Sequence, residues 1–133
     1  MTIAEVGKKY ALSQDTLRYY ERIGLIPRVN RTRSGIRDYT EEDCRWVEFV
    51  KCMRGAGLPI EVLSEYLSLF EQGDKTIEAR RELLIGQRKQ LLLRMEEMKH
   101  TLERLDVKIA MYEQGWFKGK EAAMEHHEYA AER

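Results

Sequence analysis

The sequence predicts a mainly α-helical fold, and three patterns in its 133 residues lead to this prediction. Helix-capping sequences recur at short intervals before residue 76. A stretch rich in arginine interrupts the helical periodicity around Ser34-Gly35. The character of the chain changes after residue 76, and between Gly86 and Gly115 apolar residues follow a seven-residue repeat in a run without Gly or Pro. We therefore expect a compact domain in residues 1–75, one long helix in residues 76–112 and a short tail in residues 113–133.

Two short helices should open the chain. Thr2 and Glu5 have the T-x-x-E spacing of a capping box, so the first helix should begin almost at residue 1. Ser13 is a good N-cap for the second helix, and Gly24 should end it. The connection Ala11-Leu12 is so short that the pair is typical of a helix-turn-helix, whose second helix is placed to enter a major groove of DNA. Two core helices of an ordinary small α-protein are the alternative.

The second helix should have an inner and an outer face. Leu17, Tyr20 and Ile23 recur at helical spacing and should pack inward. The opposite face is polar and should point away from the core; it consists of Gln14, Asp15, Arg18 and Arg22. This outer face therefore offers two guanidinium groups to a partner.

An arginine-rich segment follows that helix directly. Four arginines lie within ten residues around the predicted turn: Arg28, Arg31, Arg33 and Arg37. A two-stranded ribbon closed by this turn would direct them towards one partner, and phosphate matches the geometry of a guanidinium group. The local charge also favours an anionic partner. Residues 1–39 contain eight Lys/Arg against four Asp/Glu, although the whole chain has a net charge of zero.

Two further helices should complete the compact domain. Thr40 and the acidic residues after it form another capping sequence, and Pro59 suits the first turn of the next helix. The buried stripe of the first of these helices should consist of Trp46, Phe49, Val50 and Met53. That of the second should consist of Leu63, Leu67 and Phe70. On the same helical wheel, Cys52 lies at the edge of the buried face and Cys44 points towards solvent.

The long helix needs a partner chain. Its apolar residues alternate steps of four and three, as at the a and d positions of a coiled coil. These seam residues are Leu91, Met95, Met98, Leu102, Leu105, Ile109 and Tyr112. A helix of about 38 residues would be some 57 Å long, so a small domain cannot cover its stripe. We therefore expect a homodimer with two basic domains.

Other classes of protein find less support in the sequence. No apolar run approaches the roughly 20 residues that span a bilayer, and no signal-peptide pattern opens the chain, so we expect a cytoplasmic protein without membrane contact. An enzyme would need a nucleophile with a base or a convergent acid/base pair, and no glycine-rich phosphate loop or zinc signature occurs. A coiled-coil adaptor would explain residues 76–112 but not the basic segment.

Three segments together resemble one protein family. They are T-I-A-E-V-G (Thr2–Gly7), T-L-R-Y-Y-E-R-I-G-L-I (Thr16–Ile26) and R-D-Y (Arg37–Tyr39). They closely resemble the MerR family of bacterial transcription regulators, and the likeness covers about residues 2–112. The resemblance implies a winged helix-turn-helix DNA-binding domain, an antiparallel coiled-coil dimer and a palindromic promoter as the DNA partner. Members of the family distort an over-long promoter spacer, so that RNA polymerase can engage both promoter elements.

The resemblance also assigns roles to single residues. Arg18 would lie in the major groove and Tyr19 would contact the DNA backbone. Arg37 and Tyr39 of the wing would grip phosphates. With the polar residues identified above, the candidate DNA-binding set is Ser13, Gln14, Thr16, Arg18, Tyr19, Arg22, Arg31, Arg33, Arg37 and Tyr39. Capping and packing explain Ser13 and Thr16 equally well.

The absence of certain metal-ligating residues narrows the range of inducers that the protein could sense. No cysteine occurs after residue 52, so we expect no thiolate metal site in the long helix. An iron–sulfur cluster needs four cysteines, and the chain has two. We expect no metal and no cofactor, although His100, His126 and His127 leave a metal or another small ligand open as an alternative inducer. Trp116 and Phe117 should dock on the helices or on the partner subunit.

Cys52 is the candidate regulatory thiol. It stands in F-V-K-C-M-R-G (Phe49–Gly55), where Lys51 and Arg54 are cationic neighbours that favour the reactive thiolate. Acidic residues precede Cys44 and disfavour a thiolate there. The segment around Cys52 also resembles the aldehyde- and thiol-stress-sensing branch of the family, which implies control by electrophiles or oxidants. A small buried residue without reactivity is the alternative.

Overall fold

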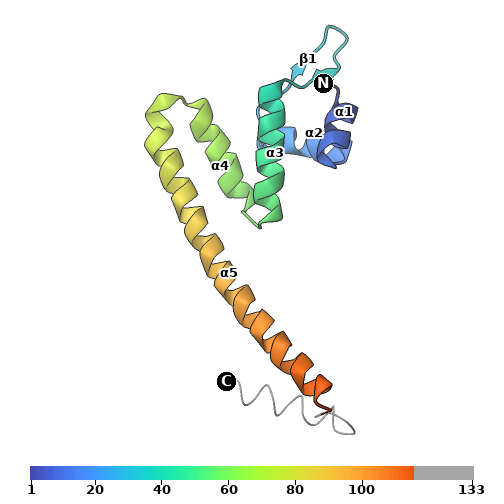
Figure 1. The fold of residues 1–133 in the computed structure, drawn as a ribbon. Helices are drawn as coiled ribbons and strands as arrows, with labels where there is room; N and C mark the ends of the chain where they lie inside the picture. Colours follow the sequence, from blue (N-terminus) through green and yellow to red (C-terminus); the bar gives the residue numbers. More distant parts are fainter. Residues whose placement is uncertain (116–133) are drawn as a thin grey trace. The chain divides into compact units, whose positions relative to one another are not determined.

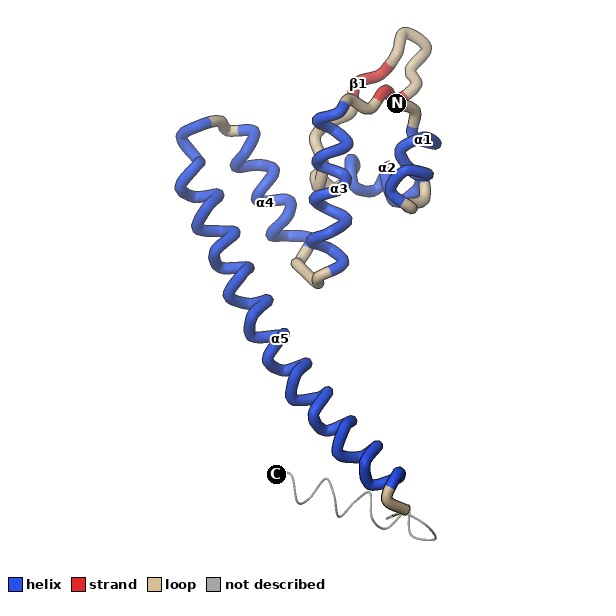
Figure 2. The backbone as a smooth tube through the Cα atoms, in the orientation of Figure 1, coloured by secondary structure: helices blue, strands red, loops and turns tan. Residues whose placement is uncertain are grey.

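The computed structural model describes residues 1–115 and has the predicted mainly helical architecture (Figures 1 and 2). Its elements are α1 (Ile3–Tyr10), α2 (Gln14–Arg22), β1 (Asn30–Arg31), β2 (Arg37–Asp38), α3 (Glu41–Gly55), α4 (Ile60–Glu71), the 3₁₀ turn η1 (Asp74–Thr76) and α5 (Ile77–Glu113). The chain divides into a unit of residues 1–89 and a unit that begins at residue 90. The expected functional boundary after residue 75 stays a prediction. Trp116, Phe117, His126 and His127 lie outside the described residues.

Reciprocal capping boxes set the starts of α1 and α3. Thr2 Oγ1 accepts a 3.1 Å hydrogen bond from the Glu5 N–H, and the Glu5 carboxylate accepts one of 2.8 Å from the Thr2 N–H. The bond from the Thr2 backbone is the main reason that the pKa of Glu5 is lowered. Thr40 and Asp43 make the same pair at 3.1 and 2.9 Å. Both helix starts are therefore local properties of the sequence.

A close approach of the backbone forms the turn between α1 and α2. Gly7 O accepts hydrogen bonds from the N–H groups of Ala11 and Leu12, the latter at 2.9 Å. Ala11 adopts the left-handed conformation with φ +54°. A Cβ atom on Gly7 would stand only 2.7 Å from Leu12 O, so the turn requires glycine at this position.

The predicted ribbon is present as the antiparallel pair β1–β2. Arg31 lies opposite Arg37 in its register, and each strand is two residues long. At the tip, the Thr32 N–H donates to Ile36 O at 2.7 Å, and Gly35 has φ +84°. The turn therefore forms where the sequence placed a glycine.

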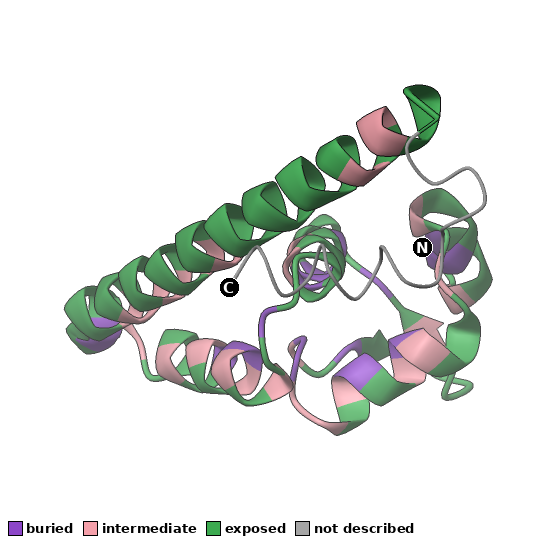
Figure 3. Cartoon of the chain, turned by 90° about the horizontal axis from the view of Figure 1, so that it is seen from below, coloured by how far each residue is buried: buried purple, intermediate pink, exposed green. Residues whose placement is uncertain are grey.

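A single apolar core holds the first unit together. Its fully buried side chains come from α1, α2, the segment after α2, α3 and α4: Val6, Leu17, Leu25, Ile26, Val47, Val50 and Leu63. Figure 3 shows the buried positions in purple. Tyr20 belongs to this core, and its burial raises the pKa of the phenol.

The buried face of α3 differs from the predicted one. Trp46 and Val50 are buried as expected, but Phe49 and Met53 are half-buried and Val47 is fully buried. The face is therefore centred nearer to Val47, because α3 packs against α1 as well as against the rings of α4. The apolar pattern of one helix does not show that a second helix packs on it.

This rotation changes the placement of both cysteines. Cys44 is 5% exposed and its Sγ lies 3.9 Å from Met1 Sδ, so the expectation that it points towards solvent is wrong. Cys52 is exposed rather than at the edge of the buried face. Of the two thiols, Cys52 is thus the one that a reagent in solution reaches.

The helix α5 has 37 residues, close to the predicted length. None of its residues is buried, and Figure 3 shows it exposed over most of its length. Leu91 is half-buried, and the other seam residues are 49–72% exposed in the single chain: Met95, Met98, Leu102, Leu105, Ile109 and Tyr112. Within residues 1–115, no helix combines the length and apolar character that a membrane span requires.

Candidate nucleic-acid interface

The cap of α2 orients its outer face. Ser13 Oγ accepts a 3.0 Å hydrogen bond from the Thr16 N–H, and the two hydroxyl oxygens lie 2.8 Å apart. Leu17 and Tyr20 point into the core. Capping therefore occupies Ser13 and Thr16 in the free chain, and their expected role in phosphate binding stays a prediction.

Arg18 is held in place on the exposed face of α2. Its Nη1 donates to Asp15 Oδ1 at 2.9 Å, and its Nη2 donates to Gln14 Oε1 at 3.3 Å. One turn further, the Arg22 guanidinium lies 5.5 Å from the centroid of the exposed Tyr19 ring. These contacts order the long side chains before any partner arrives, which lowers the entropy cost of binding.

The outer face of α2 and the ribbon meet in one basic concavity. It is lined by four guanidinium groups and one carboxylate: Arg18, Glu21, Arg22, Arg28 and Arg37. The structure thus brings together arginines from α2, from the segment after it and from β2. Four cations around a shallow surface form the type of site that attracts phosphate groups.

Glu21 joins α2 to the ribbon inside this concavity. Its Oε1 accepts a 2.7 Å hydrogen bond from Arg37 Nε, and its Oε2 accepts one of 3.2 Å from the Val29 N–H. Both members of the ion pair are mostly buried. The role of Glu21 was not predicted from the sequence. Its partners lie 8 and 16 residues away in the sequence, so no local pattern of spacing or charge indicated this contact.

The tip of the ribbon presents two further arginines. Arg31 Nη1 donates to Gly35 O at 2.9 Å, which fixes this side chain across the turn. Arg33 is exposed at the tip. Both residues stand on the surface, in agreement with the expected contact surface of the ribbon, while their contact with DNA stays a prediction.

Tyr39 lies in the core and not on the surface of the ribbon. Its side chain is 2% exposed, and its hydroxyl has no hydrogen-bond partner among the described residues. Burial raises the pKa of this phenol, although the nearby Arg37 guanidinium acts in the opposite direction. The expected grip of Tyr39 on a phosphate would therefore need the hydroxyl to reach the surface.

The cations near Cys52 in sequence are engaged elsewhere. Lys51 Nζ donates to Tyr10 O, and Arg54 Nη1 donates to Leu58 O at 2.8 Å. Cys52 itself is exposed on α3. The structure therefore supports the prediction for Cys52 only in that the thiol is accessible.

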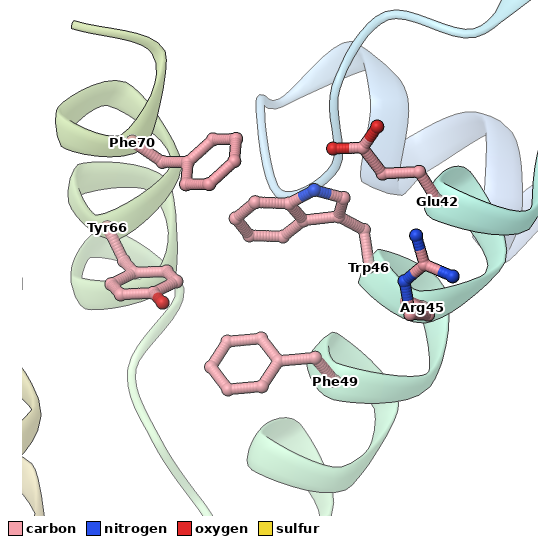
Figure 4. Close-up of a pocket in the computed structure, with 6 residues that line it drawn as sticks. All are labelled: Glu42, Arg45, Trp46, Phe49, Tyr66 and Phe70. Carbon is pink, nitrogen blue, oxygen red and sulfur yellow. The ribbon is translucent and has the colours of Figure 1, made fainter. Parts of the chain in front are cut away.

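A second concave surface lies between α3 and α4, apart from the basic one (Figure 4). It is lined by Glu42, Arg45, Trp46, Phe49, Tyr66 and Phe70. The rings contact one another at centroid distances of 5.1 to 6.2 Å, so they pack as a cluster rather than as an open cage. Phe70, which was predicted to be buried, is 38% exposed at the rim of this surface, so that part of the prediction is wrong.

His100 on α5 has two carboxylate neighbours. Its ring nitrogens lie 3.6 Å from Glu96 and 3.6 Å from Glu103, and all three side chains are exposed. No group of three or more His, Cys, Asp or Glu side chains within residues 1–115 is arranged to hold a metal ion.

Comparison with known sequences adds to this geometry. Residues 1–69 match the profile of the MerR HTH family regulatory protein, and residues 44–107 match that of MerR, DNA binding. The chain is 59% identical over 92 residues to the HTH-type transcriptional regulator AdhR of Bacillus subtilis (strain 168). This match covers 69% of the chain and 66% of that protein.

Two solved structures resemble the fold closely. One, described as a MerR family transcriptional regulator from Listeria monocytogenes, is 46% identical with a TM-score of 0.84, covering 96% of each chain. The other is HiNmlR, described as a MerR family regulator that lacks the sensor domain and is bound to promoter DNA. It is 31% identical with a TM-score of 0.79, covering 90% of this chain and 93% of that one.

The two family profiles together cover most of the described residues, including the helix-turn-helix, the ribbon and most of α5. All three relatives reported above are described as regulators, and two of them are AdhR and HiNmlR. The chain therefore belongs to the MerR family, as a DNA-binding transcriptional regulator that resembles AdhR and NmlR.

Proposed function

We propose that two copies of this chain form a homodimer that binds a palindromic promoter and controls transcription by distorting the DNA between the promoter elements. The observation on which this proposal rests is the basic concavity around Glu21, where α2 and the ribbon present their arginines together. One such surface on each subunit would bind one half-site. RNA polymerase would respond to the altered DNA and need no contact with the regulator.

The exposed stripe of α5 supports the dimer. Six apolar seam residues at least 49% exposed form a surface that water solvates poorly. Their spacing by four and three residues matches the knobs of a coiled coil, and a second α5 is the partner with the same repeat. We propose an antiparallel pairing, as the resemblance to the family implies. HiNmlR, described as bound to promoter DNA, supports DNA as the partner.

Replacing Arg18 with Ala tests the DNA-binding surface. We expect operator affinity to fall by about 1–3 kcal/mol if Arg18 reads a base, measured by fluorescence anisotropy at fixed salt. Arg81→Ala is the matched control, because Arg81 lies exposed on α5 and pairs there with Glu78 at 2.7 Å. An equal loss in both variants, or a wild-type affinity that does not change with salt, would contradict the proposal.

We further propose that Cys52 is the regulatory thiol. Its exposure on α3 and the likeness to AdhR support this assignment. The Cys52 thiolate would attack the carbonyl carbon of an aldehyde, forming a C–S bond as the C=O π bond breaks; the carbonyl oxygen would take up a proton from water, which leaves as hydroxide. The added group would change how α3 packs and thereby alter the distortion of the promoter.

Acetaldehyde and in vitro transcription with RNA polymerase test this role. The wild-type protein should change promoter output when acetaldehyde is added, and Cys52→Ser should not, although it binds the promoter equally well. Cys44→Ala is the control that keeps the response, because its thiol is buried. An unchanged response of Cys52→Ser would remove this thiol from the mechanism without affecting the DNA-binding proposal.

A further inference from the structure

The joint between α4 and α5 contains a buried hydroxyl. Thr76 is 6% exposed at the end of the 3₁₀ turn, immediately before α5 begins. Its Oγ1 donates towards the carbonyl oxygens of Leu69 and Gly73, the latter at 2.8 Å. Leu69 lies in the last turn of α4 and Gly73 just after that helix, and their carbonyl oxygens also accept backbone N–H groups from Gln72 and Thr76, each at 3.1 Å.

Arg80 closes the same joint from the first turns of α5. Its Nε donates to Thr76 Oγ1 at 3.0 Å, and its Nη2 donates to Gly73 O at 3.1 Å. The guanidinium also lies 5.3 Å from the centroid of the Phe70 ring. Every one of these contacts joins α5 to the end of α4 or to the turn between them. We call Thr76 and Arg80 together the α4–α5 latch.

The contacts of the latch favour one orientation of the first turns of α5 relative to the end of α4. The last turn of α4 contains no basic residue of its own, so Arg80 supplies the cation that favours a helix C-terminus. The planar guanidinium meets two acceptors and one ring face at once, and such a fork tolerates little change in angle.

The latch is continuous with the helix that packs on the DNA-reading element. The Phe70 ring packs edge-on against Trp46 at 5.1 Å, and Trp46 stands on α3 (Figure 4). Since α3 packs on α1, and α1 on α2, the direction of the first turns of α5 is tied through packed side chains to the reading helix.

We propose that Thr76 and Arg80 are positioning residues, which fix the direction in which α5 leaves α4 and thereby set the spacing between the two DNA half-sites that the dimer accepts. The inference rests on the homodimer proposed above. Arg80 touches no DNA in this proposal and acts through the angle at the joint.

A series of operator duplexes tests the proposal. The separation of their half-sites increases in steps of one base pair, which also rotates one half-site about the helix axis. Anisotropy should give one optimal spacing for the wild-type protein. For Arg80→Met and Thr76→Val, the ratio of affinities at the optimum and one base pair away should fall by about fivefold or more. Thr76→Ser should restore it, and Arg81→Met should leave it unchanged, because Arg81 pairs with the exposed carboxylates of Glu78 and Glu82.

A second measurement separates this inference from the proposed function. Spin labels at the exposed positions 65 and 88 of a cysteine-free chain report the angle between α4 and α5 without DNA. Excess unlabelled protein removes signals between subunits. The distance distribution should be narrow in the parent and broader in Arg80→Met. A narrow distribution in Arg80→Met, or an affinity loss equal at all spacings, would overturn the latch. A wild-type protein without any spacing optimum would instead overturn the dimeric mode of binding.

Discussion

Glu21 Oε1 accepts a 2.7 Å hydrogen bond from Arg37 Nε, and this pair fixes the DNA-reading helix α2 to the ribbon. The second carboxylate oxygen accepts from the Val29 N–H, so one side chain orders the segment that links the two elements. The ion pair uses Nε of Arg37 and leaves its terminal nitrogens for another anion. An acid at the centre of a basic surface thus organises that surface rather than opposing it.

Replacing Glu21 with Gln should therefore weaken both the fold and DNA binding. An amide oxygen can accept one of the two hydrogen bonds, and its NH₂ group faces a donor at the other. We expect a loss of about 1–3 kcal/mol in the free energy of unfolding, measured by urea titration. Operator affinity should fall as well, because Arg37 loses its orientation. Glu65→Gln, at an exposed position on α4, is the control. A Glu21→Gln variant as stable as that control would show that the pair contributes nothing.

Gly7 should not tolerate a side chain. An added Cβ would stand 2.7 Å from Leu12 O, a backbone atom that cannot rotate away. Gly7→Ala should therefore destabilise the protein by about 1–3 kcal/mol, visible as a lower midpoint of thermal unfolding. Gly55→Ala is the matched control, since nothing lies within 4 Å of that Cβ position. If both variants unfold at the same temperature, the close approach in the turn is not a constraint.

Local sequence determined most of the fold. The Thr2 and Thr40 boxes, the Ser13 cap and the glycine at position 35 act within a few residues, and each element that they predicted is present. The burial of α3 depends instead on α1 and α4 packing on different sides of it. The apolar pattern of one helix does not show which helices pack on it, and the predicted exposure of Cys44 was therefore wrong.

In the candidate site, too, some residues could be identified from the sequence and others could not. The arginines on α2 and the ribbon could be found from spacing and charge, because exposed faces follow from helical periodicity. Glu21 and Tyr39 could not, since their roles depend on contacts across 16 residues in one case and on burial in the other. The latch at Thr76 and Arg80 escaped for the same reason, because it joins the end of one helix to the start of the next.

Tyr39 should make the protein sensitive to alkali. Burial raises the pKa of its phenol above the ordinary 10.0, so the folded state favours the neutral form. The stability that this form contributes is complete below a pH of about 10 and is lost as the pH rises through the raised pKa. In Tyr39→Phe, the free energy of unfolding should fall less steeply above that pH.

The same variant should be more stable at neutral pH. The Tyr39 hydroxyl is buried without a partner in the described part of the chain, and removing such a group should stabilise the fold by about 1 kcal/mol. Tyr19→Phe is the control, because Tyr19 is exposed. Urea titrations at pH 7 and above pH 10 check both statements. A Tyr39→Phe variant less stable than wild type at pH 7 would show that the hydroxyl has a partner in solution.

The two cysteines should differ sharply in reactivity. Cys52 is exposed on α3, whereas Cys44 is buried beside Met1. In the folded protein, iodoacetamide should therefore alkylate Cys52 first, and Cys44 only as the chain opens, because a buried thiol is protected by the free energy of that opening. Peptide mass spectrometry after timed exposure measures both rates. At a urea concentration that unfolds the protein, about 8 M, the two rates should converge. Equal rates in the native protein would mean that α3 is not packed as described, and faster labelling of Cys44 would transfer the role of candidate sensor to that thiol.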